Sequence, residues 1–272
     1  MPTKYVTVDG CPIHYWHTGP STPPNIAPDV SRGAVVAFVH GAGWNAALWQ
    51  SQLAGLQTDH SPLAFDFPGH GRSGGTEALE SIEAYRDCLA GFCAALKLPP
   101  VVLVGHDLGG AAALAYAITK PAQVRALVLT GTAARFEFPS TLLDTWREVM
   151  RGRRPQPFNN DGFGSQADMA VLRFVLTEQV KTDPRVRFHD LGVCNSFEVT
   201  PWLAELHVPT LIVAGREDPY VTVEQAQSLH RGIADSQLAI IDGAGHFVPW
   251  EQPAGFQSAL TQFLTNLKAP AA

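Results

Sequence analysis

The chain has 272 residues, of which 46% are hydrophobic and 16% charged, a balance typical of a folded α/β domain with a large buried core. The net charge of −6 argues against nucleic acid or an anionic membrane as partners, and no apolar run approaches the roughly eighteen residues of a membrane span. The opening residues contain no apolar signal segment, and the four cysteines show no metal-binding spacing. We therefore expect a cytoplasmic protein with reduced cysteines.

The first half of the chain alternates between short apolar runs and helical patterns. Residues 4–8 and 13–16 predict a hairpin, and residues 19–33 predict a surface loop. Continuous apolar runs, typical of strands buried on both faces of a parallel sheet, follow at residues 34–39, 62–67, 101–104 and 124–129. Helices are predicted at residues 49–56, at 81–98 and directly after residue 110. This order predicts a parallel sheet with right-handed crossovers.

The alternation stops in the middle of the chain and then resumes. Residues 133–206 contain no clean buried strand but contain helical patterns, and we interpret them as a helical cap inserted after the sixth strand. The remaining strands and helices are predicted at residues 209–214, 223–231, 237–241 and 253–267. The expected organisation is thus a core domain of residues 1–132 and 207–272 with a cap of residues 133–206.

The most informative stretch is VVLVGHDLGG at residues 101–110. It reads as a strand, a sharp turn and a helix, and its G-x-D-x-G spacing matches the G-x-S-x-G nucleophile elbow with Asp107 in place of serine. Such a turn holds its central residue in a strained backbone conformation, so the flanking positions must be nearly free of side chain. Asp107 is therefore the candidate nucleophile.

Two further polar residues follow the carboxyl ends of predicted strands, the edge at which open α/β sheets bind ligands. His246 is the candidate general base, and Asp218 is the acid that would hold its tautomer and stabilise its cation. The backbone N–H groups of Ala42 and Leu108 are the candidate oxyanion hole. We assign His40, His70 and His106 structural hydrogen bonds.

Taken together, these motifs resemble the α/β-hydrolase superfamily over nearly the whole chain. The matching stretches are HG at 40–41, DFPGHGRS at 66–73, GHDLGG at 105–110, GREDPYV at 215–221 and GAGHFVPWEQP at 243–253. The resemblance implies an α/β-hydrolase fold: a mostly parallel eight-stranded sheet flanked by helices, with a helical cap after the sixth strand. It implies neither a metal nor an organic cofactor.

An aspartate at the elbow favours a particular chemistry. A carboxylate is ionised at neutral pH and can attack an sp³ carbon to form an alkyl ester, whereas attack on a carboxylic ester would give an unfavourable anhydride. Among relatives, aspartate at this place resembles the haloalkane and haloacetate dehalogenases and the soluble epoxide hydrolases. The chain departs from them in carrying Leu108 and Ala42 where haloalkane dehalogenases have tryptophan and asparagine, and in having no tyrosine in residues 133–206.

Three functions therefore remain open. The first is a hydrolase that opens a small, fairly apolar epoxide or alkyl halide. The second is a carboxylesterase, lactonase or C–C-bond hydrolase scaffold with aspartate, natural or engineered, at the serine position. It stays open because HGAGWNAALWQ at residues 40–50 and the stretch of residues 188–220 resemble esterases and enol-lactonases. The third is a non-catalytic ligand-binding protein. In each case the expected partner is a small molecule. The candidate substrate-binding side chains are Trp44, Trp146 and Trp202. The sequence does not decide between a monomer and a homodimer.

Overall fold

The computed structural model describes residues 1–24 and 26–267. Within them the chain forms an eight-stranded sheet in the order β1-β2-β4-β3-β5-β6-β7-β8, in which β1, β2 and β4 pair antiparallel and the other neighbours pair parallel. This confirms the predicted mostly parallel eight-stranded α/β-hydrolase sheet. The strands are β1 Thr3–Val8, β2 Cys11–His17, β3 Val35–Val39, β4 Ser61–Phe65, β5 Val101–His106, β6 Val124–Thr130, β7 Thr210–Gly215 and β8 Ser236–Ile241.

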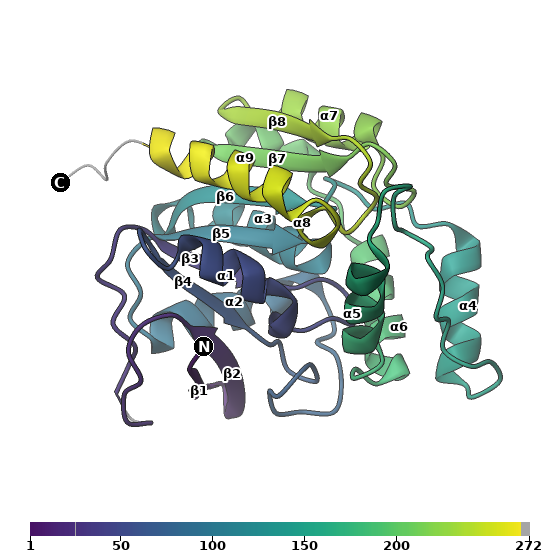
Figure 1. The fold of residues 1–272 in the computed structure, drawn as a ribbon, viewed down its shortest axis with the longest axis horizontal. Helices are drawn as coiled ribbons and strands as arrows, with labels where there is room; N and C mark the ends of the chain where they lie inside the picture. The colour runs from purple at the N-terminus through teal and green to yellow at the C-terminus, as the bar shows by residue number, and fades with distance from the viewer. Residues whose placement is uncertain (25, 268–272) are drawn as a thin grey trace.

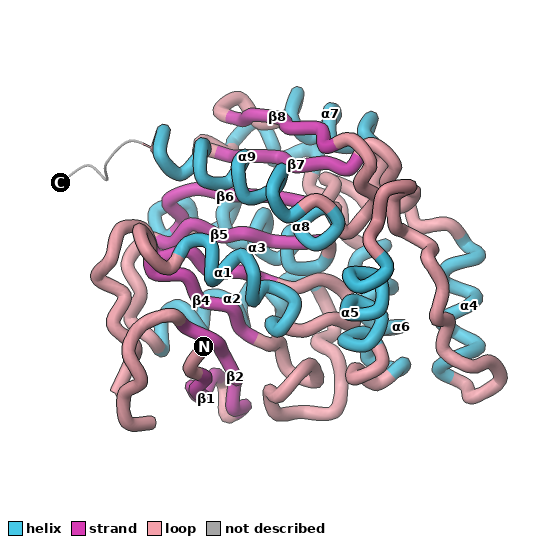
Figure 2. Tube along the Cα trace, in the orientation of Figure 1, coloured by secondary structure: helices cyan, strands magenta, loops and turns pink. Residues whose placement is uncertain are grey.

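Helices cover both faces of the sheet (Figures 1 and 2). Helices α2 and α3 pack on one face, and α1 and α9 pack on the other. The helices outside the middle of the chain are α1 Gln50–Leu56, α2 Ile82–Ala95, α3 Leu108–Thr119, α7 Val223–Gly232, α8 Val248–Glu251 and α9 Pro253–Asn266. The central strands are therefore buried on both sides, which is why they are continuous apolar runs in the sequence.

Alternate residues of each central strand belong to different cores. In β3, Val35, Ala37 and Val39 pack in the layer with α2 and α3, while Val36 and Phe38 pack with α1 and α9. This follows from the two-residue period of a strand, which points successive side chains to opposite faces. The sheet is thus held rigidly between two apolar layers, and the loops at its carboxyl edge start from fixed points.

The segment of residues 133–206, called the cap segment below, contributes α4 Ser140–Met150, α5 Met169–Gln179 and α6 Pro184–Asn195. These helices lie beside one end of the sheet (Figure 1). Helix α6, which no apolar period predicted, packs against both α3 and α4 and so carries no single apolar stripe. The division into a core of residues 1–132 and 207–272 and a separate cap remains a prediction.

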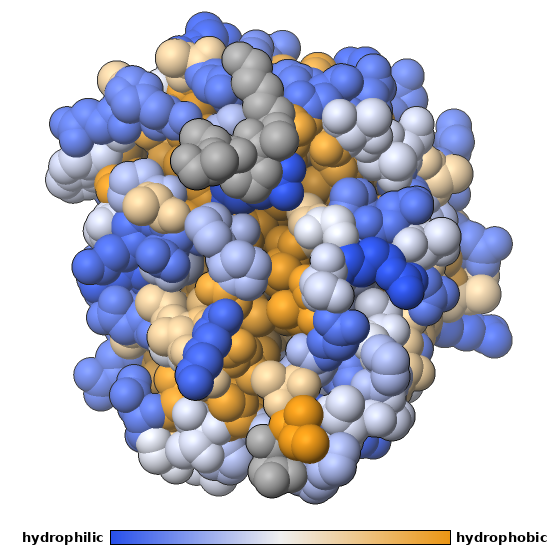
Figure 3. All heavy atoms as spheres, turned by 90° about the vertical axis from the view of Figure 1, so that its left-hand side faces the viewer, coloured by the Kyte–Doolittle hydropathy of each residue, from blue (hydrophilic) through white to orange (hydrophobic). Residues whose placement is uncertain are grey.

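Figure 3 shows the face of the molecule opposite the cap segment, where apolar side chains gather in a band between polar ones. The loops that follow β3 and β5 instead contact α6 from the cap segment. The cap segment therefore covers the carboxyl ends of the parallel strands, the edge where the sequence placed the candidate catalytic residues. No helix in the described part of the chain combines the length and apolar character that crossing a membrane requires.

Candidate active site

Asp107 lies on the turn between β5 and α3 in a left-handed backbone conformation, with φ 51° and ψ −118°. This is strained for a residue with a side chain, and such strain is characteristic of functional turns. The neighbouring glycines permit it. A Cβ atom on Gly105 would lie 2.5 Å from Cα of Gly110, and one on Gly109 would lie 2.4 Å from the carbonyl oxygen of Val39. The predicted elbow geometry is therefore present, with Asp107 buried at its tip.

The Asp107 carboxylate occupies the predicted oxyanion hole. The backbone N–H of Ala42 donates a hydrogen bond of 2.9 Å to Asp107 Oδ2, and the nearby backbone N–H of Leu108 acts to lower the pKa of the same carboxyl group. On the other oxygen, the Cys194 thiol lies with Sγ 3.8 Å from Oδ1. The two carboxylate oxygens thus have different surroundings: Oδ2 is held by the Ala42 backbone N–H, while Oδ1 faces a weak thiol donor from α6.

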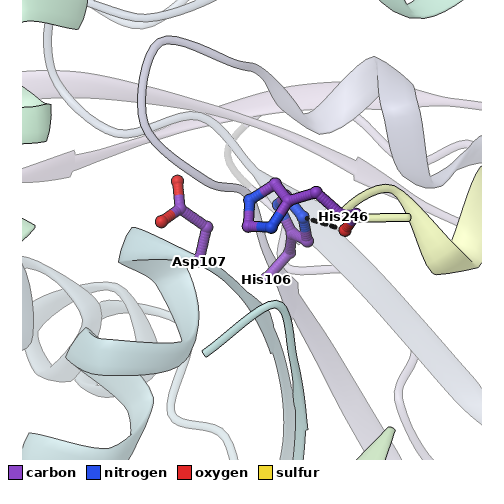
Figure 4. Close-up of side chains that lie close together, drawn as sticks. All are labelled: His106, Asp107 and His246. Atoms are coloured by element: carbon purple, nitrogen blue, oxygen red, sulfur yellow. Dashed lines mark hydrogen bonds between the residues drawn. The ribbon is translucent and has the colours of Figure 1, made fainter. Parts of the chain in front are cut away.

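His246 is oriented by Asp218, as the sequence predicts. His246 Nδ1 lies 2.9 Å from Asp218 Oδ2, and the other oxygen of Asp218 accepts hydrogen bonds from the backbone N–H groups of Tyr220 and Val221 at 2.8 and 2.9 Å. A carboxylate held in this way fixes the imidazole tautomer and leaves Nε2 free for proton transfer. Figure 4 shows the His246 ring beside the Asp107 carboxylate.

The electrostatics of the site follow from burial opposed by close charges. Burial raises the pKa of Asp107 above its usual value, although the charge of His246 and the Ala42 and Leu108 N–H groups act to lower it. Burial alone would lower the pKa of His246, but the charge of Asp218 and its hydrogen bond raise that pKa above its usual value. The pKa of His246, the candidate base, is therefore set mainly by burial and by its carboxylate partner Asp218, which act in opposite directions.

His106 lies behind the pair as a structural residue. Its Nε2 is 3.1 Å from the carbonyl oxygen of His246 and its ring packs 4.7 Å from that of His246 (Figure 4). Burial holds the pKa of His106 well below its usual value, so its neutral ring donates to that carbonyl. Ligand-type atoms of His106, Asp107 and His246 lie within 4.8 Å of one another, but two of these three side chains are the nucleophile and base candidates. We assign them no metal.

A cavity of about 550 Å³ opens between the cap segment and the core. Arg187, Tyr220 and Phe247 form part of its wall, and the rings of Tyr220 and Phe247 contact His246 at 5.4 and 5.3 Å between centroids. Asp107 and His246 themselves are almost fully buried, with 3% and 4% of their surfaces exposed. The cavity therefore ends at side chains that contact His246, the candidate base.

Arg187 of α6 supplies a cation at this end of the cavity. Its guanidinium carbon lies 4.6 Å from the ring centre of Trp44 and 4.4 Å from that of Trp146. Nε and Nη1 are buried and have no hydrogen-bond partner among the described residues. Burial lowers the pKa of Arg187 to about 10 while the nearby Asp107 acts to raise it, so the group stays charged at neutral pH. A buried cation with free donors is a binding group for an anion.

The structure separates the three predicted substrate-binding tryptophans. Trp146 lines the cavity, and Trp44 is buried against Arg187 and Phe247. Trp202 is 46% exposed and lies in a different groove beside α2 and α3. Trp202 follows the cap helices in the sequence but does not reach the cavity, because residues 200–205 run along the outside of the core.

No pattern in the sequence indicates that α6 contributes to this site. Arg187, Asp190 and Cys194 occur at helical spacings of three and four, so they share one face, and each contacts or acts on the loops around Asp107. The start signals Asp183 and Pro184 could have indicated this helix. Tyr220, two residues after Asp218, was also not singled out.

Comparison with known proteins agrees with this fold. A model of the alpha/beta hydrolase family matches residues 36–259. A 2-hydroxy-6-oxo-2,4-heptadienoate hydrolase from Pseudomonas putida is 30% identical over 261 residues, which cover 87% of this chain and 91% of that protein. The chain is also similar to two solved structures. An enol-lactonase from Burkholderia xenovorans LB400 has a TM-score of 0.82 and 21% identity over 96% of this chain and 100% of that one. A thermophilic esterase from Thermogutta terrifontis has a TM-score of 0.81 and 25% identity over 99% and 100%.

The matched region includes β3, the elbow, the Asp218 turn and the His246 loop. The relatives agree with the expected esterase and enol-lactonase resemblance and do not address the expected resemblance to epoxide hydrolases and dehalogenases. The chain is a hydrolase that belongs to the alpha/beta hydrolase family.

Proposed function

We propose that this hydrolase uses Asp107 to open a carbon–halogen or epoxide bond in a small substrate that carries an anionic group, through a covalent alkyl ester. The observation that carries this proposal is the hydrogen bond of 2.9 Å from the Ala42 N–H to Asp107 Oδ2. In a serine hydrolase the oxyanion hole receives the carbonyl oxygen of the substrate. Here the side chain of Asp107 fills it, so a bound ester has no hole to stabilise its tetrahedral intermediate.

The same arrangement suits an alkyl ester. Asp107 Oδ1 attacks the electrophilic carbon, and the bond to the halide or epoxide oxygen breaks with its electron pair leaving on that atom. The new ester keeps Oδ2 as its carbonyl oxygen, already at the Ala42 N–H. Charge then develops on Oδ2 when water attacks the carboxyl carbon, at the point where the hole stabilises it.

His246 serves this second step. Neutral His246 takes a proton from the attacking water, and Asp218 stabilises the resulting imidazolium. Collapse of the intermediate breaks the bond between the carboxyl carbon and the alkoxy oxygen, which leaves as the alcohol after receiving the proton. The carboxylate of Asp107 is regenerated with one oxygen from water, and the second proton of that water is released with the halide or, for an epoxide, balances the proton that the opened oxygen takes from solvent.

Arg187 supports an anionic substrate. Its buried Nε and Nη1 lack partners among the described residues, and burial of donors without acceptors costs free energy that an anion would recover. The Arg187 cation would also offset the repulsion between a substrate carboxylate and the negative charge of Asp107. The substrate class is therefore a halogenated or epoxidised small acid rather than the fairly apolar molecule that the sequence favoured.

The test is to trap the ester. The His246→Ala variant is incubated with a 2-chlorocarboxylic acid, an epoxy acid, and the matching chloroalkane and epoxide that lack the carboxylate. Mass spectrometry should find the alkyl group on the peptide containing Asp107 after incubation with an acid, with little from its uncharged counterpart. Asp107→Asn in the same background is the control and should stay unmodified. No adduct from any of the four compounds would contradict the proposal.

A second candidate is favoured by the comparisons: an esterase, lactonase or C–C-bond hydrolase scaffold with aspartate at the serine position. The relatives are named as a dienoate hydrolase, an enol-lactonase and an esterase. Replacing Asp107 with serine frees the oxyanion hole, so the Asp107→Ser variant should gain activity towards aryl esters under this candidate. Ligand binding without turnover in either form would instead indicate a non-catalytic binding protein, against which the Asp218–His246 hydrogen bond argues.

A further inference from the structure

A buried carboxylate on α6 ties the cap segment to the loops of the core. Asp190 is fully buried. Its Oδ2 accepts hydrogen bonds of 2.8 Å from the backbone N–H of Gly43 and from His70 Nε2, and its Oδ1 accepts one from the Tyr85 hydroxyl. Gly43 follows β3, His70 follows β4 and Tyr85 is on α2, so one side chain joins α6 to three separate parts of the core.

Asp190 pairs with His70 inside the protein, where both side chains are fully buried. His70 Nδ1 lies 2.9 Å from the carbonyl oxygen of Pro68, and Nε2 faces Asp190. Burial alone would lower the pKa of His70, but the charge of Asp190 and its hydrogen bond raise that pKa above its usual value. The other titratable groups around His70 are His40, with its ring 4.8 Å away, and Asp66. A buried ion pair of this kind fixes geometry when every polar atom is satisfied.

The contact to Gly43 lies one residue from the oxyanion hole. Ala42, the preceding residue, donates its N–H to Asp107 Oδ2. The orientation of that N–H depends on the backbone of residues 41–43, and Asp190 holds this backbone from the cap side. Cys194, one turn further along α6, reaches the other oxygen of Asp107. Helix α6 therefore contacts both the nucleophile and the backbone beside its donor.

We propose that Asp190 is a positioning residue, which holds the Gly43 backbone so that the Ala42 N–H points into the oxyanion hole only when α6 is seated on the core. The predicted effect on catalysis rests on the proposed function, in which the hole serves hydrolysis of the Asp107 ester and not its formation. Loss of Asp190 should then slow the second chemical step more than the first. If Asp190 merely stabilised the fold, its loss would lower the rates of both steps together.

The experiment compares Asp190→Asn with Tyr85→Phe, which removes another hydrogen bond of the same carboxylate without touching Gly43. Rapid-quench mass spectrometry with the 2-chlorocarboxylic acid measures the rates of ester formation and hydrolysis on Asp107. Hydrogen exchange of peptides covering residues 41–46 measures the loop without any substrate. Asp190→Glu, which keeps the charge but moves the oxygens, is a second variant in case Asp190→Asn does not fold.

In Asp190→Asn we expect hydrolysis to fall by about tenfold or more relative to ester formation, since removing one oxyanion donor costs on the order of a hundredfold or more. Exchange in residues 41–46 should rise by roughly tenfold, as expected for loss of a hydrogen bond to a charged acceptor. Tyr85→Phe should change the ratio of the two rates by less than about twofold, because Gly43 keeps its acceptor.

Unchanged exchange in both Asp190 variants would overturn the proposal, as would a ratio of rates that changes equally in Tyr85→Phe. Failure of the proposed function looks different. In that case wild-type and His246→Ala protein form no ester on Asp107, while the exchange measurement still reports whether Asp190 holds Gly43.

Discussion

The Ala42 amide lies 2.9 Å from Asp107 Oδ2, so the nucleophile candidate occupies its own oxyanion hole. This contact joins the loop after β3 to the turn after β5, two neighbouring parallel strands. It divides the carboxylate into Oδ2, which a backbone N–H holds, and Oδ1, which faces only the weak Cys194 thiol donor. The predictions below follow from this division and from the groups that surround it.

The Asp218→Asn variant should lose most of the hydrolytic step. Its amide cannot stabilise the imidazolium of His246, and loss of such a carboxylate costs on the order of 10⁴ in kcat in a serine triad. The pKa of His246 should also fall, because burial is then no longer opposed by the charge of Asp218. Steady-state rates measured across pH should show both effects; an unchanged profile would contradict the assigned role of Asp218.

The wild-type protein should hydrolyse the Asp107 ester faster as the pH rises through the pKa of His246. Water activation requires the neutral ring, and the charge of Asp218 holds the pKa above the usual value of 6.5. The acidic limb of the kcat profile should therefore lie above pH 6.5. Ester formation needs only the Asp107 carboxylate, so in single-turnover measurements it should stay flat over the same range.

Replacement of Arg187 should change the recognition of anionic substrates. Arg187→Met removes the charge but keeps an apolar side chain between Trp44 and Trp146, and KM for the acid should rise about ten- to hundredfold. KM for the acid in Arg187→Lys should lie between the values of the wild type and of Arg187→Met, because lysine keeps the charge but not the planar contact with the two tryptophan rings. The uncharged chloroalkane is the control, and an equal effect on both compounds would assign Arg187 to the leaving group instead.

Truncation of Trp146 should have large effects on activity and stability, whereas truncation of Trp202 should have small ones. Trp146 is buried and lines the cavity, so Trp146→Ala should alter KM and lower the free energy of unfolding by about 3–5 kcal/mol. Trp202 is 46% exposed and lies outside this cavity. Trp202→Ala should leave kcat/KM within about twofold and cost less than about 1 kcal/mol in a urea titration. A large loss of activity in Trp202→Ala would restore its predicted role in substrate binding.

The elbow should not tolerate a methyl group at Gly105. A Cβ there would lie 2.5 Å from Cα of Gly110, which is backbone and cannot move aside, so Gly105→Ala should destabilise the protein by at least about 1–3 kcal/mol. Gly192 in α6 is the matched control, because nothing lies within 4 Å of its added Cβ. Gly192→Ala should raise the free energy of unfolding by about 0.5–1 kcal/mol. Equal changes of the thermal unfolding temperature in Gly105→Ala and Gly192→Ala would contradict the close packing of Gly105 against Gly110.

Local sequence determined the elements and the positions of the chemistry. The apolar runs predicted the central strands because burial on both faces removes every polar position. The glycines around Asp107 predicted the elbow because only they fit its turn. Asp218 and His246 could be assigned because both directly follow predicted strands, and the carboxyl ends of parallel strands meet at one edge.

Only the tertiary structure decided which cap residues reach that edge. Helix α6 has no apolar stripe because it packs on two sides, so its pattern says neither that Arg187 lies between two tryptophans nor that Asp190 holds Gly43. Trp202 and Trp146 look alike in sequence, yet only one lines the cavity. The contacts of Asp190 with Gly43 and His70 join residues more than a hundred positions apart. The free energy that selects such contacts comes from packing and buried charge, which no local pattern encodes.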